Sequence, residues 1–189
     1  IGNLKVDHSI IDQLVESSTT QGSKIVFQQI DKKYEEDEHS LEMHLPYIRK
    51  MFETRMQDSS TDIQIIPLMV GQIPDDDYSK YAQVLVPYFT DDRTLFVISS
   101  DFCHWGERFK FTHKYENFDE VEIYKSIEQL DKLGIQQIEM QSLAGFQQYL
   151  KDTKNTICGR NPIQLLLAII EEAGKQEAKV FSTEFVKYD

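Results

Sequence analysis

The sequence LFVISSDFCHWG, at positions 95–106, joins an apolar run to a segment rich in reactive groups. Residues 99–106 carry a carboxylate, a thiol, an imidazole, two hydroxyls and the single Trp of the chain. An apolar run that ends in small polar residues is typical of a buried strand, here 94–99, and open α/β sheets bind ligands just past such strand ends. We therefore expect a functional site at 99–106. The structural alternative is that Asp101 caps a turn while Cys103, His104 and Trp105 pack.

The rest of the chain alternates predicted strands and helices. Further strands are expected at 24–30 and 62–73, and helices at 8–17, 74–89, 119–134, 142–151 and 162–173. Another helix is expected from about residue 40, with Pro46 in its first turns or at a kink. Residues 108–118 are expected to form a loop, Gly134 to end one helix and Asn161 to cap another. This alternation predicts an α/β fold, a sheet covered by helices, in one domain over 1–189.

Bulk composition excludes some classes of partner. The chain of 189 residues has 32 acidic and 20 basic side chains, a formal net charge of -12. Nucleic acid and anionic membrane surfaces attract basic proteins, and no segment approaches the roughly 20 apolar residues of a spanning helix. Two cysteines fit a reducing compartment rather than a disulfide framework. We expect a cytoplasmic location, with a nuclear one as an alternative.

Six side chains could carry chemistry: His39, His44, Asp101, Cys103, His104 and Cys158. A metal site would need ligands from separate elements, because no CxxC or HExxH motif occurs. Helical spacing places His44 on an apolar face. The alternative is that these groups are hydrogen-bonded core and cap residues, as buried polar groups usually are.

Two catalytic interpretations use the same residues. Cys158 is the better nucleophile candidate, because it precedes a predicted helix N-terminus and lies two residues from Arg160. Cys103, between Phe102 and His104, is expected to be an inert packing residue. Nothing in the sequence supplies a recognisable oxyanion hole, which disfavours a thiol hydrolase. Asp101 and His104 could form an acid/base pair, or could be a cap and a satisfied surface histidine.

Four ordered blocks resemble one known family. They are DEHSLEMHLPY at 37–47, SSDFCHWGERF at 99–109, IYKSIEQLDK at 123–132 and NTICGRNPI at 155–163. By these blocks the chain is identified as a member of the MEMO family, named for mediator of ErbB2-driven cell motility. The resemblance implies a central mixed sheet flanked by helices, similar to class III non-haem iron extradiol dioxygenases. It also implies an iron- or copper-binding redox protein with a signalling role in cell motility.

The resemblance also assigns site residues. It implies that Cys158 is a metal ligand with two upstream histidines, that Asp101 and His104 handle protons, and that His39, His44 and Arg160 line the pocket. The region with those histidines and the closing segment after Tyr188 are not in this chain, so we expect a fragment that completes its metal site only in the intact protein, and one whose open sheet edges favour association. A thiolate in place of the dioxygenases' carboxylate shifts preference toward copper or zinc, so ring cleavage is not expected.

A second function class comes from the same resemblance. Animal members are described as adapters for signalling proteins, in which the pocket would receive a phosphotyrosine-containing peptide without chemistry. An acidic chain would need a local cluster of cations for this role, which Arg108, Lys110, Lys114 and Arg160 could supply.

Overall fold

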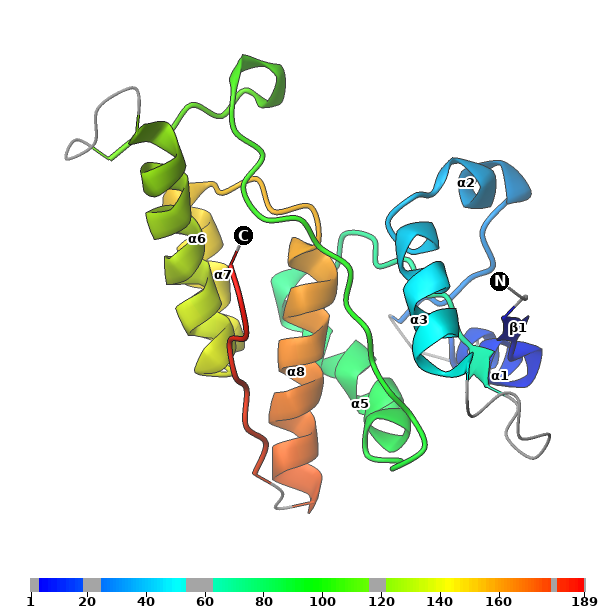
Figure 1. Cartoon of the computed structure of the whole chain (residues 1–189). Helices are drawn as coiled ribbons and strands as arrows, with labels where there is room; N and C mark the ends of the chain where they lie inside the picture. Colours follow the sequence, from blue (N-terminus) through cyan, green and yellow to red (C-terminus); the bar gives the residue numbers. More distant parts are fainter. Residues whose placement is uncertain (1–3, 19–24, 54–62, 116–121, 178–179, 189) are drawn as a thin grey trace. The chain divides into compact units, whose positions relative to one another are not determined.

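The computed structural model describes residues 4–18, 25–53, 63–115, 122–177 and 180–188. The chain forms two compact units, residues 1–70 and 71–189, and Figure 1 shows the helices of each. Each unit is described by itself below. Among the described residues, no helix is both long enough and apolar enough to cross a membrane. The prediction of a single domain stays a prediction.

The first unit contains three helices and a short parallel sheet in its described part. β1 (Lys5–Val6) pairs with β2 (Gln64–Ile65), with Val6 opposite Ile65. α1 (His8–Ser17) begins as predicted, because the Asp7 carboxylate accepts the Ile10 N–H at 3.1 Å and so satisfies a free amide of the first turn. α2 spans Lys32–Asp37.

Pro46 lies in the first turn of a helix and not at a kink. A short 3-10 helix, η1 (Glu42–His44), leads directly into α3 (Leu45–Met51). The first turn is where the missing amide of proline costs nothing, since that N–H would have no partner inside the helix. Upstream, the Glu38 carboxylate accepts the backbone N–H groups of Ser40 and Leu41, at 2.7 and 2.9 Å.

The second unit is helical in its described part. Its main helices are α5 (Tyr78–Phe89), α6 (Ile123–Glu139), α7 (Leu143–Thr153) and α8 (Arg160–Glu177). A 3-10 turn, η2 (Asp75–Asp77), precedes α5. The apolar residues of α8 face several neighbours, since α8 packs against both α5 and α7. The core contains Phe111, Leu130, Phe146, Tyr149, Ile157, Ile163 and Leu167.

The predicted central sheet differs most from what is observed. Residues 94–99 and 25–30 are not strands in the part of the chain that the structure describes, and within 63–73 only Gln64–Ile65 forms a described strand. A run of apolar residues becomes a strand only when a neighbour takes its backbone hydrogen bonds. Leu95 is 67% exposed, unlike a residue of a strand buried in a sheet. The observed architecture is therefore helix-rich with a small parallel sheet, and the likeness to class III dioxygenases stays a prediction.

Several helix boundaries differ from the prediction. Gly134 does not end α6, which continues to Glu139, because Gly134 is the place where Tyr149 of α7 packs against the helix. A Cβ at this position would lie 2.8 Å from the Tyr149 ring. Asn161 lies inside α8 rather than capping it, and α8 runs past Gly174 to Glu177. Ser142 caps α7 through its hydroxyl, which accepts the Gly145 N–H at 3.0 Å.

The loop after residue 105 and the C-terminal segment both lie against these helices. η3 (Glu107–Phe109) is closed by a bridge between Gly106 and Phe111, and Gly106 has a φ of 120°, which favours glycine. The described part of the predicted 108–118 loop is otherwise irregular, and 116–118 lie outside the described residues. Residues 180–188 follow α6 toward its middle (Figure 1), where the Tyr188 hydroxyl meets Asp131.

Candidate functional site

Two segments far apart in the sequence form the site in the second unit. The Cys158 N–H donates to the Asp101 carbonyl at 3.2 Å, and the Gly159 N–H donates to Ser100 Oγ at 3.1 Å. Further along, the His104 N–H donates to Thr156 Oγ1 at 2.8 Å. Residues 100, 101 and 104 thus pair with residues 159, 158 and 156, so the two segments run in opposite directions. This places Cys158 beside Asp101 at the end of the predicted strand.

Gly159 permits the close approach of these two segments. A Cβ at Gly159 would lie 2.3 Å from Ser100 Cβ and 2.6 Å from the Ser99 carbonyl oxygen. Both distances are shorter than any real contact, and one of the atoms belongs to the backbone. Only glycine fits here without moving the segment that carries Asp101.

Thr156 fixes the orientation and tautomer of His104. Its hydroxyl accepts the His104 N–H and donates to the His104 carbonyl at 2.7 Å. The ring nitrogen Nδ1 lies 2.8 Å from the Thr156 carbonyl oxygen. A carbonyl can only accept, so we assign the proton to Nδ1, which leaves Nε2 of the neutral ring with a free lone pair. Phe109 packs edge-on against the imidazole, with 5.1 Å between ring centroids.

Asp101, His104 and Cys158 form a group that could hold a metal ion. One ligand atom from each residue lies within 4.8 Å of the other two. Two ligands that share an ion at about 2.0–2.3 Å can be no more than about 4.6 Å apart, so a small adjustment would bring all three to one ion. Asp101 and Cys158 are exposed and His104 is half-buried, so the group is open to solvent.

The backbone around Cys158 is arranged to receive a thiolate. The Asp101 N–H lies 3.1 Å from Cys158 Sγ and can donate to it. The sulfur lies 3.5 Å from the Asp101 carbonyl oxygen, to which a neutral thiol can donate. Cys158 therefore has a partner in both protonation states, and the thiolate form is the one that binds metals.

The other thiol is in a different environment. Cys103 packs against the hydrophobic core of the second unit. Burial, and next the nearby Asp131 carboxylate, raise the pKa of Cys103 to about 11. The thiol of Cys103 therefore stays protonated near neutral pH.

The remaining predicted site residues are His39, His44 and Arg160. His39 is exposed and His44 is half-buried at the end of η1, and both belong to the first unit. Arg160 is exposed at the start of α8, where its Nη1 donates to the Ile157 carbonyl at 2.9 Å. The pocket-lining roles of these three residues stay predictions.

Sequence reasoning missed Asp131, which is 2% exposed in α6. Its signal was present: Ile127, Leu130, Gly134 and Ile138 mark the apolar face of α6, and Asp131 falls on that face. A charged residue at a core position is almost always paired, so it should have been marked as part of a polar network.

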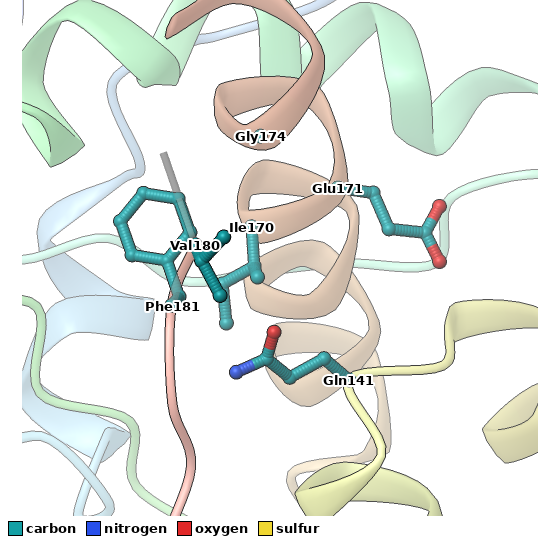
Figure 2. A pocket seen from close by; sticks show the side chains of 6 residues that line it. All are labelled: Gln141, Ile170, Glu171, Gly174, Val180 and Phe181. Carbon is teal, nitrogen blue, oxygen red and sulfur yellow. The ribbon is translucent and has the colours of Figure 1, made fainter. Parts of the chain in front are cut away.

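A hollow elsewhere in the same unit holds little chemistry. Gln141, Ile170, Glu171, Gly174, Val180 and Phe181 line it, and Figure 2 shows Val180 and Phe181 beside Ile170 of α8. Glu171 is the ionisable side chain among these residues, and its Oε1 already accepts the Leu143 N–H at 3.0 Å. The group at Asp101, His104 and Cys158 is the stronger candidate.

Fold and site together define a helix-rich α/β protein with a group that could hold a metal ion. The family model described as Memo-like protein matches residues 1–187. The chain is 43% identical over 171 residues to Protein memo-1 homolog of Caenorhabditis elegans, which is 90% of this chain and 45% of that protein. It is 38% identical over 186 residues to Protein MEMO1 of Homo sapiens, 98% of this chain and 58% of that protein. The chain belongs to the Memo-like protein family.

The zebrafish relative, Protein MEMO1 of Danio rerio, is 43% identical over 150 residues, 79% of this chain and 48% of that protein. The chain thus spans about half the length of the curated relatives that it matches. The family prediction made from four sequence blocks is confirmed.

Proposed function

We propose that this chain carries part of a redox metal site in which Cys158 is a ligand and Asp101 and His104 face the same ion. The single observation behind the proposal is that the three ligand atoms lie within 4.8 Å of one another. The fixed tautomer of His104 adds support, because it turns a free Nε2 lone pair toward ligand binding or proton transfer.

The donor set fits a borderline or soft metal better than a hard one. Thiolate and imidazole ligands suit copper, zinc and iron, whereas magnesium and calcium prefer oxygen alone. We propose iron or copper, and such an ion would supply one-electron chemistry. The protein's own part is to orient the ligands, and to give or take a proton at His104 Nε2 and the Asp101 carboxylate. Further histidine ligands, and lining by His39, His44 and Arg160, belong to this proposal for the intact protein, in a dioxygenase-like pocket.

Metal content tests this proposal, and the chain offers a matched control. The Cys158→Ser and Cys103→Ser variants make the same change at the exposed thiol of the group and at the thiol that packs against the core. After anaerobic loading of the full-length protein with Fe²⁺ or Cu⁺ and desalting, we expect bound metal in the wild type and in Cys103→Ser. We expect at least about a tenfold loss of affinity in Cys158→Ser. Equal metal content in all three proteins would exclude Cys158 as a ligand.

An adapter that binds a phosphopeptide is the second candidate. One observation favours it: Arg108, Lys110 and Lys114 are all exposed in the loop that follows His104, in a chain of net charge -12. Arg108 lies over the Phe109 ring, 5.8 Å from its centroid, and the same ring packs against the His104 imidazole. Peptide binding that survives metal removal and His104→Ala, but not Arg108→Ala with Lys110→Ala, would favour the adapter over the metal protein.

A further inference from the structure

A buried carboxylate behind the site accepts hydrogen bonds from three parts of the second unit. Asp131 of α6 accepts the Cys103 N–H at 3.3 Å, an Asn155 Nδ2 hydrogen at 2.8 Å and the Tyr188 hydroxyl at 3.1 Å. Its side chain is one of the few charged groups in the core, at 2% exposure. All three donors point to an ionised carboxylate, which can only accept.

Two of these donors come directly before the two residues of the contact that orients the imidazole, His104 and Thr156. Cys103 precedes His104 itself, and Asn155 precedes Thr156, whose carbonyl and hydroxyl hold the imidazole and the backbone of His104. Asp131 thus joins the two antiparallel segments one residue away from the contact that sets the tautomer. Any change in the spacing of the segments would lengthen the bond from Nδ1 to the Thr156 carbonyl.

The orientation of Asn155 supports this joining role. Asn155 donates both amide hydrogens, one to Asp131 and one to the Tyr149 hydroxyl at 2.6 Å. Its Oδ1 is buried without a hydrogen-bond partner among the described residues. Reversing the amide would place Oδ1 against the carboxylate, where two acceptors repel. The observed orientation therefore keeps the hydrogen bond from Asn155 to Asp131, although it leaves Asn155 Oδ1 without a partner among the described residues.

We propose that Asp131 is a positioning residue for the candidate metal site, which sets the spacing of segments 101–104 and 155–158 and thereby holds His104 with Nδ1 protonated and Nε2 free. This inference rests on the proposed function only for its effect on metal binding. Its effect on the imidazole is a property of the metal-free chain. Tyr188 donates from the C-terminal segment and does not join the two site segments, so its loss should matter less.

Histidine tautomers in the metal-free protein provide the first test. Nitrogen-15 NMR at about pH 8.5 distinguishes a proton on Nδ1 from one on Nε2 of a neutral ring. The wild type, Tyr188→Phe and the control Asp152→Asn, which removes an exposed carboxylate, should keep the Nδ1 proton on His104. Asp131→Leu, which removes all three bonds, should shift His104 toward the Nε2 tautomer, and the isosteric Asp131→Asn should do so more weakly.

Affinity for Co²⁺ alone provides the second test. We expect about a tenfold to hundredfold loss of affinity in Asp131→Leu and a smaller loss in Asp131→Asn, as for other groups that orient metal ligands. Tyr188→Phe and Asp152→Asn should stay close to the wild type. A folded Asp131→Asn or Asp131→Leu variant with the wild-type tautomer and affinity would overturn the inference.

The two proposals can fail separately. If the wild-type chain binds no Co²⁺ but the Asp131 variants still change the His104 tautomer, the positioning role stands and the metal proposal falls. If the wild type binds Co²⁺ through Cys158 while the tautomer ignores Asp131, the metal proposal stands and the positioning role falls. Should Asp131→Leu fail to fold, Asp131→Asn alone decides the tautomer question.

Discussion

Residues 100–104 of the second unit and residues 38–44 of the first unit are both rich in polar side chains, but bonds of different reach hold them. Ser100, Asp101 and His104 are held by residues 52–59 positions away in the sequence. Around His39, the Glu38 carboxylate takes N–H groups two and three positions away. Local bonds shape a turn, whereas the long-range bonds bring reactive groups from separate elements together. The second kind of region is where a ligand set can be built.

The reactivity of the two thiols should differ most. Cys158 is exposed. Burial, with the nearby Asp131 carboxylate, raises the pKa of Cys103 to about 11. At pH 8 only about a thousandth of a thiol with that pKa is thiolate, which is the form that reacts. Iodoacetamide should label Cys158 at least about a hundredfold faster than Cys103, as measured by mass spectrometry of the two peptides. Equal rates in the folded protein would contradict this difference in environment, and equal rates in urea are the control.

Gly159→Ala should separate the two segments that long-range hydrogen bonds hold together around residues 100–104. The new Cβ would overlap Ser100 and the Ser99 carbonyl, so the segments must separate, at a cost of about 1–3 kcal/mol in the free energy of unfolding. Trp105 is the single Trp and packs against the core of this unit, so its fluorescence reports the urea transition. The matched control is Gly71→Ala, because a Cβ there would meet nothing within 4 Å. A transition unchanged in Gly159→Ala would show that the close approach is not required.

Removing one hydroxyl from each region compares them directly. Thr156→Val leaves the part-buried His104 N–H without its acceptor, which should cost about 1–3 kcal/mol in local stability. Ser40→Ala removes a hydroxyl that bonds to the neighbouring Glu38 carboxylate, where water can replace it, and should cost less than about 1 kcal/mol. Amide hydrogen exchange of the peptides around each site measures both effects. A larger effect for Ser40→Ala would reverse the comparison.

Of these measurements, a pH titration should give the smallest effect, and only around residues 38–44. Burial tends to raise the pKa of Glu38, but hydrogen bonds from Ser40 and Leu41 outweigh burial and lower it. A lowered pKa stabilises the fold above the ordinary carboxyl range, and this stabilisation is lost as pH falls through the folded-state value. The amide NMR signals of Ser40 and Leu41 should therefore shift in acid. Glu38→Gln should remove that titration, and its persistence in the variant would mean that another group causes it.

Sequence reasoning found what local chemistry decides. It placed a helix at 8–17, whose start the Asp7 side chain fixes, and it left Pro46 either in the first turns of a helix or at a kink, a choice that the structure decides for the first turn. It also singled out Asp101, His104 and Cys158, because each stands next to a strand end or a helix start. The family resemblance indicated which sequence blocks belong to the site, but it did not show that residues 100–104 contact residues 156–159.

Long-range packing decided the rest. Gly134 looks like a helix terminator, yet it is the place where Tyr149 packs against α6. Residues 94–99 have the apolar pattern of a buried strand, yet they are not among the strands of the described residues. Thr156 carries no signal of its own, since any hydroxyl could stand there, and its role appears only when His104 is seen beside it.

The ligand shell of the metal bound to the full-length protein provides the most direct test. X-ray absorption at the iron or copper edge counts sulfur, nitrogen and oxygen neighbours by their distances. We predict one sulfur at about 2.3 Å with nitrogen or oxygen neighbours at about 2.0–2.1 Å. The sulfur should disappear in Cys158→Ser and remain in Cys103→Ser. A shell without sulfur in the wild type, or one that keeps its sulfur in Cys158→Ser, would contradict the claim that Cys158 binds metal beside Asp101 and His104.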